Sequence, residues 1–481
     1  MPLTIDSENN DARGHLLNLC TTLTELFDIM AATLAYLRND HPRPKEMCDA
    51  NHRACKKILP KLAAFWPNFI RAYTKARINQ AQKTARNNTT DVPKKYLHKL
   101  EVASFLTVTG ILIDYMQHPD PMVRSAGESV ILEHLDWFKE YGSILNESLL
   151  NSFLKNPVLL KELIPIIVDN IRSAELNYDL LAMGLRAHHY GYRESTAIAE
   201  AAYGRLQELL APYQITNAKQ FLDAWLHSHE DKSFILAKVI RNNLETMRDL
   251  EALRPGICRA LNEEFGIFCF ARYPTALLIE QYARRDDDQL PYGTVFYPKN
   301  DHNGAFYYSN QLLSSLFQRL DGKYYLRVFE GGDKVSLAQA FHQLKNRYST
   351  HLISFALLGG HGTPQSINLG HPPSSYKTNA KDIITTDDLL DPKNIRRHPV
   401  GKWSKYFAKG ATIILESCST GMQSGIGQIL SQLLGLRVIG PDKDSALNSI
   451  DVDFKDQQIE FQAQYHDAAT KAYASGQPGQ P

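Results

Sequence analysis

Two short motifs hold the residues of this 481-residue sequence that are best suited to chemistry. The first is Gly359–Gly362 (GGHG), which contains His361, and the second is Glu416–Gly421 (ESCSTG), which contains Cys418. Each motif follows an apolar run directly. A cysteine thiolate is a strong nucleophile, and a histidine base activates it. The sequence therefore predicts a thiol–imidazole pair, with the Gly362 N–H placed to stabilise a developing oxyanion.

Other interpretations compete with a catalytic one. A free cysteine after a buried strand is often a small hydrophobic core residue rather than a nucleophile. A second candidate cluster is formed by Cys48, His52 and Cys55, which lie at i, i+4 and i+7 on one helix face. Structural zinc normally takes four ligands, and the nearby sequence offers no obvious fourth. We therefore predict no metal site.

Alternating strands and helices after Pro291 are expected to position the two motifs. Strands are expected at residues 294–297, 324–329, 352–358, 412–415 and 436–439. Amphipathic helices are expected at residues 311–320, 335–346 and 426–434. This alternation is typical of a mostly parallel sheet with helices on both faces. In such open sheets the chemistry lies beyond the carboxyl ends of the strands, where both motifs fall.

The first 288 residues have a different pattern. They are typical of a large all-α domain, and residues 120–135 resemble the second helix of a HEAT-type repeat, although no clean repeat period is present. The basic stretch at 75–98 is either a solvated face or a surface for an acidic partner. We therefore predict a helical regulatory or interaction domain at 1–288 and an α/β domain at 289–470. Residues 471–481 are polar and rich in proline and glycine, which favours a disordered tail.

Composition limits the partners and the compartment. The formal net charge is +1, which gives no electrostatic reason to expect binding to nucleic acid or to a membrane surface. No apolar run approaches the roughly 20 residues that span a bilayer. The opening residues lack the apolar core of a secretory signal. The six cysteines are sparse and show no disulfide-type spacing, so we expect a cytoplasmic, reducing location.

The order of these elements resembles that of the clan CD cysteine peptidases. This group includes caspases, metacaspases, legumain and clostripain-like enzymes, and the order is strand, helix, strand, helix, strand with His-Gly, long loop, strand with Cys. GGHG and ESCSTG look closest to the bacterial clostripain-like and CHAT-type members, as do Ile384–Leu390 (ITTDDLL) and Arg437–Pro441 (RVIGP). The resemblance covers roughly residues 290–450. It implies a caspase-like fold and cysteine endopeptidase activity.

The resemblance also implies roles for individual residues. Cys418 would be the nucleophile, and His361 would handle the proton transfers. The N–H groups of Gly362 and Cys418 would form the oxyanion hole. Glu416, two residues before the nucleophile, and Asp301, soon after the first strand, would line the S1 pocket and favour Arg or Lys at P1. Legumain-like enzymes carry an acid at the Glu416 position with asparagine specificity, so that alternative stays open.

The expected partners follow from this assignment. We expect a protein or peptide substrate and a regulatory protein partner for the helical domain, with no cofactor. Some clan CD enzymes need calcium, but the sequence has no EF-hand-type loop. The alternatives are a catalytically inactive caspase-like scaffold and an acyl-transfer enzyme using the same pair. Arg284-Arg285, just before the predicted domain junction, is a candidate self-processing site.

Overall fold

The computed structural model describes residues 157–190, 196–226, 233–301, 304–307, 309–370, 381–391, 399–455 and 458–474, together with Glu128, Leu132 and Leu135. Contacts divide the chain into two compact units, residues 1–180 and 181–481. The zinc candidates at 48–55, the basic stretch at 75–98 and most of the HEAT-like segment lie outside the described residues. None of the described helices is long and apolar enough to cross a membrane.

Residues 157–283 contain helices wherever the structure describes an element. The α-helices are α8 Pro157–Arg172, α9 Tyr178–Tyr190, α10 Thr196–Leu210, α11 Ala218–Leu226, α12 Ser233–Leu253, α13 Ile257–Phe265 and α14 Thr275–Ala283. Two 3-10 turns, η4 Ala211–Tyr213 and η5 Phe270–Arg272, lie between them. Helices α10 to α14 belong to the same compact unit as the sheet that follows.

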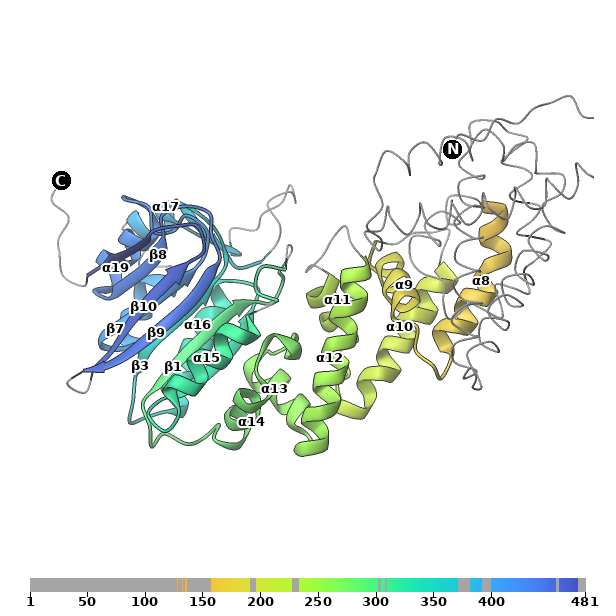
Figure 1. The fold of residues 1–481 in the computed structure, drawn as a ribbon, viewed down its shortest axis with the longest axis horizontal. Helices are drawn as coiled ribbons and strands as arrows, with labels where there is room; N and C mark the ends of the chain where they lie inside the picture. The colour runs from red at the N-terminus through yellow and green to blue at the C-terminus, as the bar shows by residue number, and fades with distance from the viewer. Residues whose placement is uncertain are drawn as a thin grey trace, which may run out of the picture. The chain divides into compact units, whose positions relative to one another are not determined.

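The second half of the chain forms the predicted α/β architecture (Figure 1). Its six-stranded sheet has the order β11-β8-β7-β3-β1-β2, parallel except for β11. The strands are β1 Tyr292–Pro298, β2 Tyr325–Gly331, β3 Ile353–Gly359, β7 Phe407–Glu416, β8 Arg437–Pro441 and β11 Thr470–Tyr473. The prediction of a mostly parallel sheet flanked by helices is thus confirmed for this part of the chain.

Helices cover the sheet on both faces. They are α15 Asn310–Leu320, α16 Lys334–Arg347, α17 Thr386–Leu390 and α19 Ile426–Leu434, with the 3-10 turn η6 Pro399–Tyr406. The chain moves in opposite directions from β1 to β2 and from β2 to β3. Right-handed crossovers therefore place α15 and α16 on opposite faces. Phe341 of α16 packs against Trp403 and Phe407, which fixes that helix on its face.

Six further strands of the described chain were not predicted from the sequence. β4 His361–Thr363, β5 Ser366–Asn368 and β6 Ile383–Thr385 form a small antiparallel sheet. β9 Leu447–Lys455 and β10 Gln458–Tyr465 form a hairpin that packs on the main sheet, with the Phe461 and Phe355 rings 4.6 Å apart. β11 includes residues 471–473, so the sheet continues beyond the position at which the tail was expected to begin.

The helical segment before the sheet packs against the edge strand β2 and forms hydrogen bonds with its backbone. The side chain of Gln281 in α14 pairs with both backbone groups of Val328: Val328 N donates to Oε1 at 2.7 Å, and Nε2 donates to Val328 O at 3.0 Å. Gly266, just after α13, lies so close to the Glu330 carbonyl that a Cβ would meet it at 2.7 Å. These contacts explain why the compact unit begins well before residue 289, where the composition of the sequence changes.

Candidate active site

The two candidate catalytic residues leave the main sheet from neighbouring strands at the same level. Gly359 at the end of β3 is in register with Glu416 at the end of β7. His361 and Cys418 each lie two residues beyond this pair. Because neighbouring strands lie about 4.8 Å apart, both residues reach the same point of the carboxyl edge. The structure thus brings together the motifs that the sequence paired.

Gly362 packs directly against the backbone of Cys418. A Cβ on Gly362 would lie 2.8 Å from Cys418 N and would also overlap Cys418 O and Ser417 Oγ. Carbon contacts of this kind are normally about 3.5 Å or longer, so only glycine allows this approach. The two backbones are therefore adjacent, as an oxyanion hole made from their N–H groups requires.

Replacing Gly362 by alanine is expected to displace the Cys418 loop. The atoms that a new methyl group would meet are mainly backbone, which cannot rotate away. We expect a loss of about 10²-fold or more in kcat/KM, because a donor misplaced by about 1 Å costs that much. The matched control is Gly332→Ala, since a Cβ there meets nothing within 4 Å. Equal activity of the two variants in a peptide-hydrolysis assay would contradict the assignment of Gly362.

The loop that carries Cys418 is held from several sides. Gly421 N donates to Pro441 O at 2.7 Å, and the Tyr473 hydroxyl of β11 donates to Gly421 O at 2.8 Å. Ser419 adopts a left-handed backbone conformation with φ of 57°, and its Oγ donates to Asp444 at 2.5 Å. A serine with positive φ is uncommon and is found where surrounding contacts impose it, often at functional sites. The Cys418 loop is therefore a fixed structure.

His361 faces a buried carboxylate. Its Nε2 lies 3.4 Å from Asp301 Oδ1, and Asp301 is fully buried. The same carboxylate accepts the N–H groups of Ala305 at 3.0 Å and Phe306 at 2.8 Å. The Phe306 ring in turn packs edge-on against the His361 ring, with centroids 5.4 Å apart. The loop after β1 thus holds His361 both by charge and by packing.

The ionisation of Asp301 fits this position. Burial alone raises the pKa of Asp301, but the contact with His361 and the charge of Arg272 outweigh it, so the pKa lies below its ordinary value. The structure gives Asp301 a position that the sequence did not predict, against the imidazole. Its assignment to an S1 pocket stays a prediction.

Glu416 is a second buried carboxylate at this edge. The Tyr297 hydroxyl, at the end of β1, donates to Glu416 Oε2 at 2.8 Å. Burial raises the pKa of Glu416 to about 7, with Asp301 adding to the rise and the Tyr297 hydrogen bond opposing it. Tyr297 was not predicted as a site residue, although its place at the carboxyl end of the first predicted strand was a usable signal.

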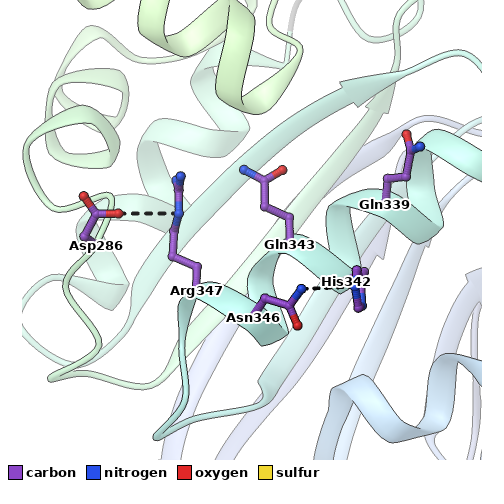
Figure 2. A pocket seen from close by; sticks show the side chains of 6 residues that line it. All are labelled: Asp286, Gln339, His342, Gln343, Asn346 and Arg347. Atoms are coloured by element: carbon purple, nitrogen blue, oxygen red, sulfur yellow. Dashed lines mark hydrogen bonds and ion pairs between the residues drawn. The ribbon is translucent and has the colours of Figure 1, made fainter.

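A polar groove lies elsewhere on the molecule. Figure 2 shows its lining from the middle to the C-terminal end of α16 and in the linker before β1, and its volume is about 770 Å³. The lining residues are Asp286, Gln339, His342, Gln343, Asn346 and Arg347. Because α16 runs back from the carboxyl end of β2 to the amino end of β3, this part of the helix lies away from the carboxyl ends of the strands. The groove is therefore separate from the edge that carries His361 and Cys418.

The Arg284-Arg285 segment is anchored in the fold. The carbonyl of Arg284 accepts a hydrogen bond from Arg327 Nη2 at 2.7 Å, and that of Arg285 accepts one from the Tyr348 hydroxyl at 2.6 Å. A peptidase must bind the scissile segment in an extended, accessible form, so these bonds disfavour the self-processing hypothesis. In the described part of the chain, no group of three or more His, Cys, Asp or Glu residues could hold a metal ion.

No protein-family model matches the sequence, and no match to it was found among curated proteins or solved structures. A proposed function therefore rests on the residues of the site.

Proposed function

We propose that residues 181–474 form a caspase-like cysteine endopeptidase of the clan CD type, with Cys418 as nucleophile and His361 as acid–base catalyst. The observation that carries this proposal is the placement of both residues two positions beyond one register pair of β3 and β7. The close packing of Gly362 on the Cys418 backbone supports it. So does the contact of His361 with a buried carboxylate.

The proposed reaction uses these groups in sequence. The Cys418 thiolate attacks the scissile carbonyl carbon, a C–S bond forms, and the N–H groups of Gly362 and Cys418 bind the resulting oxyanion. His361 donates a proton to the leaving amine as the C–N bond breaks. Water then attacks the thioester carbon while His361 accepts a proton from it, and the C–S bond breaks to release the carboxylic acid and restore the Cys418 thiolate. Asp301 would hold the imidazole in orientation and stabilise its protonated form, as the carboxylate of a catalytic triad does.

We further propose that Glu416 is the carboxylate that selects a basic P1 residue. It lies two positions before Cys418, and 8% of its surface is exposed, whereas Asp301 is fully buried. A charge-assisted hydrogen bond to Arg or Lys requires the ionised form of Glu416. Because the pKa of Glu416 is raised to about 7, that form is complete only above neutral pH.

Glu416→Gln is expected to lower kcat/KM for Arg and Lys substrates about 10- to 150-fold, the range that corresponds to a charged hydrogen bond of about 1.5–3 kcal/mol. In the wild type, kcat/KM for these substrates should rise as the pH increases through about 7, because the carboxylate forms in that window. The glutamine variant should lack this rise in kcat/KM and show only the pH dependence that comes from Cys418 and His361. An unchanged P1 preference in Glu416→Gln would count against the assignment.

A fluorogenic peptide panel with Arg, Lys, Asn and Asp at P1, with and without calcium, tests the whole proposal. We expect turnover at Arg and Lys that Cys418→Ala does not show. Cleavage confined to Asp or Asn would refute the basic-P1 assignment but leave the peptidase. Inactivity on all four, with an electrophilic peptide probe that does not prefer Cys418, would favour the scaffold. Transfer to an added amine in preference to hydrolysis would favour the acyl-transfer enzyme.

A further inference from the structure

A fully buried arginine of the helical segment contacts strands β1 and β2 next to the proposed site. Arg272, in the η5 turn before α14, is fully buried and forms an ion pair with Glu330 of β2 at 2.9 Å. The same nitrogen, Nη1, donates to Pro298 O at 3.1 Å, three residues before Asp301. Arg272 therefore holds together the carboxyl ends of β1 and β2.

The ion pair is extended by further buried contacts. Glu330 Oε2 accepts the N–H groups of Phe268 at 2.8 Å and Cys269 at 3.2 Å, and its Oε1 accepts the Tyr273 hydroxyl at 3.1 Å. The Glu330 carboxylate thus accepts from four donors, all of them in residues 268–273. Such a network is costly to build in a protein interior unless its members satisfy one another.

The network also reaches Glu416. The Arg272 guanidinium lies 5.8 Å from the centre of the Tyr297 ring, and the Tyr273 ring stacks on the same ring at 6.3 Å. The Tyr297 hydroxyl donates to Glu416 Oε2. Arg272 therefore contacts the side chain that holds the proposed P1 carboxylate and the strand end that leads to Asp301.

We infer that Arg272 is a positioning residue for Asp301 and Glu416, supplied to the peptidase by the helical segment rather than by the α/β sheet. The inference rests on the proposed function. The ionisable groups that interact with these carboxylates are Cys269, Arg272, Tyr297, His361 and Tyr465, and Tyr273, Lys299 and Glu330 belong to the network behind them. Among them, Arg272 is a cation whose charge lowers the pKa of both Asp301 and Glu416; burial opposes it at both groups, and is outweighed at Asp301 but not at Glu416.

The test compares Arg272→Met with Arg327→Met in the full chain. Arg327 is also a fully buried arginine of this unit, but it bonds to Arg284 O and Asp287 O, away from the site. For Arg272→Met we expect the acid limb of kcat/KM on an Arg-P1 substrate to move up by on the order of one pH unit, with a raised KM. Rates are expressed per titrated active site, so a simple loss of folded protein does not alter them.

Two milder variants keep the test decisive if Arg272→Met does not fold. Arg272→Lys keeps the charge but not the planar fork, so the acid limb should stay near the wild-type position while KM rises. Glu330→Gln keeps the cation, so its acid limb should lie at or below that of the wild type. If Arg272→Met has the KM and the acid limb of the wild type, the inference is overturned. If Arg272→Met does not fold, the inference is overturned when Arg272→Lys has both wild-type values and Glu330→Gln has a raised acid limb. A wild type that cleaves no peptide would instead overturn the proposed function.

Discussion

Replacing Cys418 by alanine is expected to lower kcat for peptide hydrolysis by about 10⁴- to 10⁶-fold, and His361→Ala to have an effect of similar size. The nucleophile and its acid–base partner act as one unit, so the double variant should lose little more than either single variant. Active-site titration with an electrophilic peptide probe measures the same pair independently. Cys418 should react selectively, and His361→Ala should abolish that selectivity.

The buried thiols provide a matched control for this experiment. Cys269 is fully buried, and burial raises its pKa to about 12, so it should react slowly at neutral pH. Cys269→Ala should therefore retain activity and probe labelling at Cys418, although it removes volume from the core. Hydrolysis that survives in Cys418→Ala, or labelling spread evenly over the cysteines, would contradict a catalytic role.

The parts of the fold that were predictable are those whose signal is local. Buried parallel strands are continuous apolar runs, and each expected strand overlaps an observed one; the expected helix 426–434 coincides with α19. His361 and Cys418 could be paired because both follow such runs, and parallel strands end at one edge. Boundaries at the less apolar ends were less accurate. β7 begins at Phe407, five residues before the expected start, because Lys409 and Gly410 interrupt the apolar pattern in its first residues.

The parts that were missed depend on contacts between distant residues. The β9–β10 hairpin is stabilised by packing on the sheet, as in the Phe461–Phe355 contact, which no local pattern reveals. The position of Asp301 against His361 depends on how the loop after β1 folds back on itself. Arg272 lies 146 residues before Cys418 in a helical region, so nothing in its neighbourhood connects it with a catalytic edge.

A fragment of residues 289–481, which corresponds to the α/β half predicted from the sequence, is expected to be insoluble or to lack cooperative unfolding. It would lose Gln281, which forms hydrogen bonds with both backbone groups of Val328 in the edge strand β2. It would also lose Arg272, which neutralises buried Glu330. Removing one partner of a buried ion pair costs about 3–5 kcal/mol, a large share of the roughly 5–15 kcal/mol that stabilises a domain. An unpaired edge strand also invites association between chains.

The matched control is a fragment of residues 177–481, which keeps α9 to α14 and begins at the Asn177 side chain that caps α9. It should remain soluble and melt cooperatively, as followed by circular dichroism and size-exclusion chromatography. In the full chain, Gln281→Leu should lower the melting temperature without changing the P1 preference, because it affects the edge and not the site. A cooperative melt of the 289–481 fragment close to that of the longer one would show that the helices are dispensable. Loss of this helical segment would therefore affect the β2 edge through Gln281 and the proposed site through Arg272.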